Sequence, residues 1–108
     1  MIKHDTILLC SSSRENRQEL RRVFSDAYHV LESGDPSQLI LLLKQNRDCV
    51  AAVLLDTSDL HEEDAVWTSW EENRGLLEGI PVIILSAEDT PAILNRAFSQ
   101  GAADVIPI

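Results

Sequence analysis

Polar side chains stand at the ends of the apolar runs of this chain, where a folded sheet would bring them together. Asp56 ends the apolar run 50–55, Ser86 ends a second run, and Ser11 and Ser12 follow a third. In open α/β sheets, ligands bind in the crevice beyond the carboxyl ends of the strands, so Asp56 is a candidate for ligand binding. A structural role, in which its carboxylate bonds the backbone of the following loop, fits the position equally well.

The histidines and cysteines do not form a recognisable metal or redox site. His4, His29 and His61 are widely spaced, and none has a second histidine at a helix spacing that would form a metal face. Cys10 and Cys49 lie in or beside apolar segments and lack C-x-x-C spacing. We therefore expect ordinary surface or boundary histidines and two reduced thiols.

Nucleotide-binding and hydrolase motifs are also missing. No G-x-G-x-x-G follows an apolar run, and the chain contains neither a Walker-A lysine loop nor a G-x-S-x-G elbow. A small flavin- or nucleotide-binding enzyme would need a phosphate-binding loop, which the serines at 11–13 could form through hydroxyls and helix N-terminal amides. A capped helix start explains these serines more simply, and we do not expect an enzyme.

Composition excludes two further classes of partner. Eighteen Asp and Glu residues against nine Lys and Arg residues give a formal net charge of -9, whereas binding to a phosphate backbone requires clustered basic residues. The longest apolar runs are far too short to span a bilayer, and the first five residues lack a signal-peptide pattern. We expect a cytoplasmic protein with no direct nucleic-acid or membrane partner.

Apolar runs alternate with segments that carry helix signals. Strands are predicted at 6–10, 28–31, 50–55, 80–85 and 103–106. The first helix has capping-box spacing at Ser12 and Glu15, the second has Asp35 as N-cap and Pro36 as its first residue, and the last ends at Gly101. The inward stripes are predicted at Leu20, Val23, Phe24 and Ala27, at Val66, Trp67, Trp70 and Leu77, and at Ile93, Leu94, Ala97 and Phe98.

This alternation predicts an α/β domain with a parallel sheet, right-handed crossovers and helices on both faces. Residues 1–108 suit one such domain, because the length allows one core and is too short for two. The carboxyl ends of the strands then present Ser11, Ser12, Asp56 and Ser86 at one edge.

Four stretches of the chain, in order, resemble the receiver domain of two-component response regulators. They are residues 6–10 (TILLC), 53–56 (VLLD), 80–87 (IPVIILSA) and 101–106 (GAADVI). The resemblance covers nearly the whole chain, and the last two stretches are specific in combination. It implies a CheY-like, flavodoxin-like doubly wound sheet of five parallel strands in the order 2-1-3-4-5.

The resemblance also implies roles for three residues. Asp56 would accept a phosphoryl group from a histidine of a sensor kinase or a phosphotransfer protein, with Mg²⁺ assisting. Ser86 matches the switch hydroxyl that bonds the phosphoryl group. The metal ligands would be Asp56 and the backbone carbonyl of Ser58.

Other positions depart from the receiver pattern. Ser11 and Ser12 replace the usual acidic pair, so Mg²⁺, which prefers anionic oxygen ligands, should bind weakly. Ile108 stands at the position of the usual lysine, and loss of such a charge partner costs about 3 to 4 kcal/mol of transition-state stabilisation. Val105 replaces the aromatic residue of the switch. Phosphorylation of Asp56 should therefore be slow and poorly stabilised.

Two functions fit this mixture of retained and replaced residues. In the first, the domain is the signal-receiver module of a phosphorelay protein, with Asp56 as phosphoacceptor and an attached output domain. In the second, it is a pseudo-receiver that serves protein interaction or homodimerisation without phosphoryl chemistry. Asp56 and Ser86 favour the first function, whereas Ser11, Ser12 and Ile108 favour the second.

The resemblance stops before the fifth helix that receivers carry after their last strand. Its absence would leave an apolar patch on one sheet face. We expect residues 1–108 to be the N-terminal part of a longer protein with an output domain, and a partner protein that covers the patch is the alternative.

Overall fold

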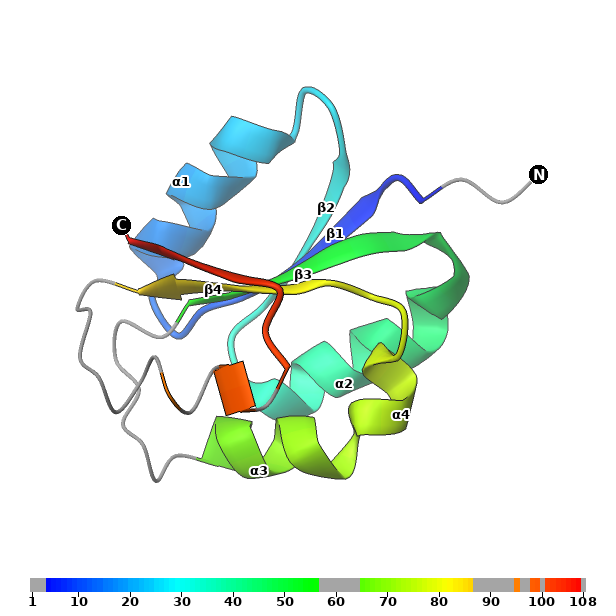
Figure 1. The fold of residues 1–108 in the computed structure, drawn as a ribbon. Helices are drawn as coiled ribbons and strands as arrows, with labels where there is room; N and C mark the ends of the chain where they lie inside the picture. Colours follow the sequence, from blue (N-terminus) through cyan, green and yellow to red (C-terminus); the bar gives the residue numbers. More distant parts are fainter. Residues whose placement is uncertain (1–3, 57–64, 87–94, 96–97, 100, 108) are drawn as a thin grey trace.

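The computed structural model describes residues 4–56, 65–86, 95, 98–99 and 101–107. The strands are β1 (Thr6–Cys10), β2 (His29–Ser33), β3 (Val50–Asp56), β4 (Val82–Ser86) and β5 (Asp104–Pro107). The helices are α1 (Arg14–Phe24), α2 (Pro36–Asn46), α3 (Ala65–Glu72) and α4 (Arg74–Leu77), with a 3₁₀ turn at Arg47–Cys49. The strands form one parallel sheet in the order β2-β1-β3-β4-β5 (Figure 1), which confirms the predicted doubly wound topology.

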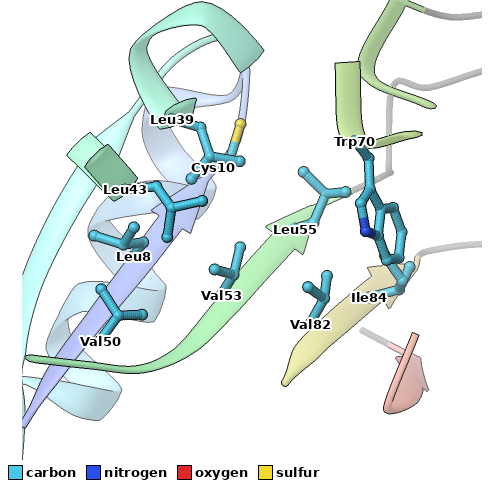
Figure 2. Close-up of a cluster of buried hydrophobic side chains, with 10 residues drawn as sticks. All are labelled: Leu8, Cys10, Leu39, Leu43, Val50, Val53, Leu55, Trp70, Val82 and Ile84. Carbon is cyan, nitrogen blue, oxygen red and sulfur yellow. The ribbon is translucent and has the colours of Figure 1, made fainter. Parts of the chain in front are cut away.

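The central strands are continuous apolar runs because helices cover both faces of the sheet. Leu8 and Leu9 of β1 are 0% and 1% exposed, although successive side chains of a strand point to opposite faces. The layer between the sheet and α2 and α3 is drawn in Figure 2 and comprises Leu8, Cys10, Leu39, Leu43, Val50, Val53, Leu55, Trp70, Val82 and Ile84. The layer on the α1 face comprises Ile7, Leu9, Val30, Leu54 and Leu85, with Leu20 and Phe24 of α1 packed against it.

Side-chain caps define where α1 and α2 begin. Ser13, and not the predicted Ser12, caps α1: its Oγ accepts a hydrogen bond from the backbone N–H of Asn16 at 3.2 Å, which satisfies an amide that has no partner within the helix. Asp35 caps α2 as predicted, because its carboxylate accepts from the N–H of Gln38 at 2.9 Å and the predicted proline follows it.

Some side chains that were expected to face inward lie at the surface. Val23 is 68% exposed and Phe98 is 57% exposed, and Ala27 is exposed beyond the end of α1. The side chains of α1 that pack against the sheet are Leu20 and Phe24. Trp70 is buried and Leu77 packs against its cluster, as predicted. The remaining predicted positions Val66, Trp67, Ile93, Leu94 and Ala97 lie outside the described side chains.

Element boundaries shift by one or two residues from their predictions. The strand expected at 80–85 begins at Val82, since Pro81 has no N–H to donate to a ladder. The segment expected to form one helix contains two, α3 and α4, separated at Asn73. Gly101 has a φ of 94°, the left-handed conformation that glycine adopts after a helix. Among the described helices, none is long and apolar enough to cross a bilayer.

Candidate functional site

The carboxyl edge of the sheet brings Ser11 and Asp56 together. Asp56 is the last residue of β3 and lies opposite Leu85 of β4 in the strand register. Ser11 follows β1, and its backbone N–H donates to the carbonyl oxygen of Ser33 at 3.1 Å. Both residues are buried: Ser11 is 1% exposed and Asp56 is 7% exposed. The parallel topology thus creates this pair from positions 45 residues apart.

Asp56 accepts hydrogen bonds from two neutral donors. The hydroxyl of Ser11 donates to Oδ2 of Asp56 at 2.7 Å, and Nδ2 of Asn16 donates to the same oxygen at 2.9 Å. A hydrogen bond to a charged group contributes about 1.5 to 3 kcal/mol. These two hydrogen bonds therefore connect the start of α1 and the residue after β1 to the end of β3.

The backbone around Ser11 holds both donors in place. The hydroxyl of Ser11 accepts a hydrogen bond from the N–H of Ser13 at 3.1 Å while it donates to Asp56. Nη1 of Arg17 donates to the carbonyl oxygen of Ser11 at 2.6 Å. Asn16 is fixed by the first turn of α1, where its N–H bonds the cap. The site is a local network in which the start of α1 positions two donors toward one carboxylate.

Asn16 is the residue of this network that the sequence reasoning missed. It lies four positions before Leu20, whose side chain packs against the sheet, so the helix period places both on the inner face of α1. A polar residue in this inward stripe, in the first turn of the helix that follows β1, was the signal that could have identified it.

The other candidate residues are only partly described. Ser12 is exposed, in contrast to the buried Ser11. Ser86 ends β4 and pairs in register with Pro107, but its side chain is outside the described part, as is that of Val105. Ser58 and Ile108 lie outside the described residues altogether.

The donor set around Asp56 does not fit a resident Mg²⁺. Over the described part of the chain, no three His, Cys, Asp or Glu side chains come together in a group that could hold a metal ion. Mg²⁺ prefers hard anionic oxygens and gives up its water molecules reluctantly. Two partners of Asp56 are instead a hydroxyl and an amide that direct hydrogens at its carboxylate.

The thiol beside the site is suited to packing rather than reaction. Cys10, the last residue of β1, is 5% exposed and unpaired. Burial raises the pKa of its thiol above the ordinary value, which keeps it protonated and a poor nucleophile. Cys49 is also unpaired, so the expectation of two free thiols is confirmed.

Comparison with known proteins identifies the family of this chain. No family model matches the chain. Two-component response regulator ORR24 of Oryza sativa subsp. indica is 32% identical over 79 residues, which are 73% of this chain and 12% of the length of that protein. The chain is a CheY-like receiver domain. The matched region is about an eighth of the length of ORR24.

Two solved structures illustrate the range of proteins that share this receiver fold. A CheX-CheY-BeF3-Mg²⁺ complex from Borrelia burgdorferi contains a chain with a TM-score of 0.80 and 17% identity, covering 96% of this chain and 78% of that one. A putative pilus assembly-related protein from Burkholderia pseudomallei has a TM-score of 0.79 and 20% identity, with coverage of 96% and 78%. These similarities establish the fold of the receiver domain.

Replacing Ser11 with alanine is expected to destabilise the receiver domain by about 2 kcal/mol, because the buried carboxylate of Asp56 loses a donor at 2.7 Å. A double-mutant cycle with Asp56→Ala, measured by urea denaturation, isolates the coupling between the two side chains. We expect a coupling energy above about 1 kcal/mol. Additive effects of the two substitutions would contradict the proposed contact.

Proposed function

We propose that this receiver domain is a pseudo-receiver, which signals through protein contacts and does not depend on a stable aspartyl phosphate. One observation carries the proposal: Oδ2 of Asp56 is bonded by the neutral donors Ser11 and Asn16. In this reading Asp56 is a structural residue that holds the start of α1. The pair Ser11 and Asp56 places a single carboxylate, with a neutral hydroxyl beside it, at the carboxyl edge of the sheet.

Phosphoryl transfer to Asp56 would be difficult in this environment. A carboxylate oxygen would form a bond to phosphorus while the bond from phosphorus to the donor nitrogen or oxygen breaks, and the added dianion would have to fit beside Ser11 and Asn16. Catalysis of this reaction rests on positioned cations. Ser11 and Ser12 supply no carboxylate for Mg²⁺, and the sequence has Ile108 where receivers carry lysine. Any Mg²⁺ binding is proposed to be weak and confined to Asp56 and the carbonyl of Ser58.

The second candidate function is a slow phosphoacceptor that receives its phosphoryl group from a sensor kinase or phosphotransfer protein. The position of Asp56 at the end of the central strand, with Ser86 ending the adjacent strand, favours it. Both candidates share a setting that we propose: a cytoplasmic domain, not itself an enzyme, with an attached output domain and contacts to proteins rather than nucleic acid or membrane. A homodimer is one form that these contacts could take.

Intact-mass spectrometry after treatment with acetyl phosphate and Mg²⁺ separates the two candidates. We expect no phosphoryl adduct on the protein under conditions in which a competent receiver domain, treated in parallel, is phosphorylated. The Asp56→Asn variant is the control for the site of modification. An adduct on the unmodified protein that is absent from Asp56→Asn would overturn the pseudo-receiver proposal and establish the phosphoacceptor.

A further inference from the structure

The first helix concentrates the positive charge of an otherwise acidic chain. Arg14, Arg17, Arg21 and Arg22 are four of nine basic residues, against eighteen acidic ones. The first three follow a spacing of three and four residues, which places them on one face of α1. Arg22 does not line the groove described below and pairs with Glu19. A local basic surface therefore exists on a chain whose formal net charge is -9.

This basic face borders a polar groove between α1 and the β2–α2 connection. The groove has a volume of about 430 Å³. Its lining consists of Arg14, Arg17, Gln18, Glu32, Ser33, Gly34 and Gln38. Guanidinium and amide groups thus outnumber the single carboxylate in the groove.

The positive charge in the groove is only partly balanced. Glu32 is shared by two guanidinium groups: it lies 2.6 Å from Nη1 of Arg21 and 3.9 Å from Nε of Arg17. The side chain of Arg17 is 22% exposed, and it donates to the carbonyl oxygen of Ser11 at 2.6 Å. Arg14 is exposed and forms no ion pair with another described residue. Three arginines therefore face one glutamate.

Gly34 keeps the space beside Arg17 open. A Cβ at this position would lie 3.4 Å from Nη1 of Arg17 and 3.9 Å from Oε1 of Gln38. The φ of Gly34 is not in the left-handed region, so the backbone does not require glycine here. Because glycine has no side chain, space remains next to the guanidinium group of Arg17.

We propose that this α1–β2 groove, as defined by its lining residues, binds an acidic segment of a partner protein. Arginine presents a planar fork of donors that matches a carboxylate, and the groove offers Arg14 and Arg17 beside amide donors. A short acidic peptide needs only this local charge, whereas a long nucleic-acid backbone would also meet the repulsion of the acidic remainder. The proposal rests on the proposed function as a protein-interaction module and names one surface for it.

Fluorescence anisotropy with a fluorescein-labelled peptide of six glutamates tests the groove. We expect binding by the unmodified protein in about 0.1 M salt, where charges beyond about 10 Å are screened, and none of an uncharged six-serine peptide. Arg14→Glu should weaken binding about tenfold or more. This variant should fold, because an acidic residue at a helix start is favourable. Arg22→Glu, the matched charge change on the same helix outside the groove lining, should weaken binding less than about threefold.

A second variant tests the space rather than the charge. Gly34→Leu would fill the groove beside Arg17 and should also weaken binding about tenfold while the charge is unchanged. The proposed binding of an acidic segment in the groove would be overturned if the acidic peptide failed to bind. It would also be overturned if Arg14→Glu and Arg22→Glu weakened binding equally. Neither result depends on phosphorylation of Asp56, which the acetyl phosphate experiment decides separately.

Discussion

Replacing Ser11 with aspartate is expected to make the stability of the domain depend on Mg²⁺. The hydroxyl of Ser11 lies 2.7 Å from Oδ2 of Asp56 in a buried setting, so the substitution places two carboxylates side by side and removes a donor. An uncompensated buried charge costs about 3 to 5 kcal/mol. A divalent cation between the two carboxylates would offset this cost, because paired anionic oxygens are the ligands that Mg²⁺ prefers.

Thermal unfolding with and without 10 mM Mg²⁺ measures this dependence. We expect the Tm of Ser11→Asp to lie well below that of the unmodified protein without Mg²⁺ and to rise when Mg²⁺ is added. At about tenfold excess over Kd, bound ligand stabilises by about 1.4 kcal/mol. Ser11→Asn is the matched neutral control and should not respond. A Tm of the unmodified protein that rises equally with Mg²⁺ would contradict the absence of a fitted metal site.

The fold was predictable because its signals are local. Continuous apolar runs such as Val50–Leu55 occur where a strand is buried on both faces, and the structure places this run at the centre of the sheet. Asp35 and a following proline mark a helix start by their own chemistry. The cap of α1 was misplaced by one residue because three consecutive serines offer equivalent hydroxyls. Only the backbone conformation distinguishes Ser13 from its neighbours.

The candidate site was less predictable because its contacts join distant segments. The carboxyl edge of the strands follows from topology, so the neighbourhood of Ser11 and Asp56 could be expected. The amide of Asn16 reaches the same carboxylate from 40 residues away. Arg17 likewise bonds Ser11 and borders the groove beside Gly34. Such contacts depend on the packing of α1 against β2, which no pattern within either element specifies.

Replacing Leu43 with alanine is expected to remove about 3 to 5 kcal/mol of the free energy of unfolding. Leu43 is 0% exposed and lies with Leu39 and Val53 in the layer between α2 and the sheet (Figure 2). Truncation of a buried leucine loses its transfer free energy and leaves a cavity. A small void of about 20 Å³ already adjoins these side chains, so the substitution would enlarge a space that the core does not fill.

Leu41→Ala is the matched control, since Leu41 belongs to the same helix and is 56% exposed. Its substitution should change the free energy of unfolding by less than about 0.5 kcal/mol. Urea denaturation followed by tryptophan fluorescence measures both variants, with the buried Trp70 as a reporter. Small domains have total stabilities of about 5 to 15 kcal/mol, so the core variant should lose a large share of the total. Equal effects of the two substitutions would mean that α2 does not pack through the face that carries Leu43.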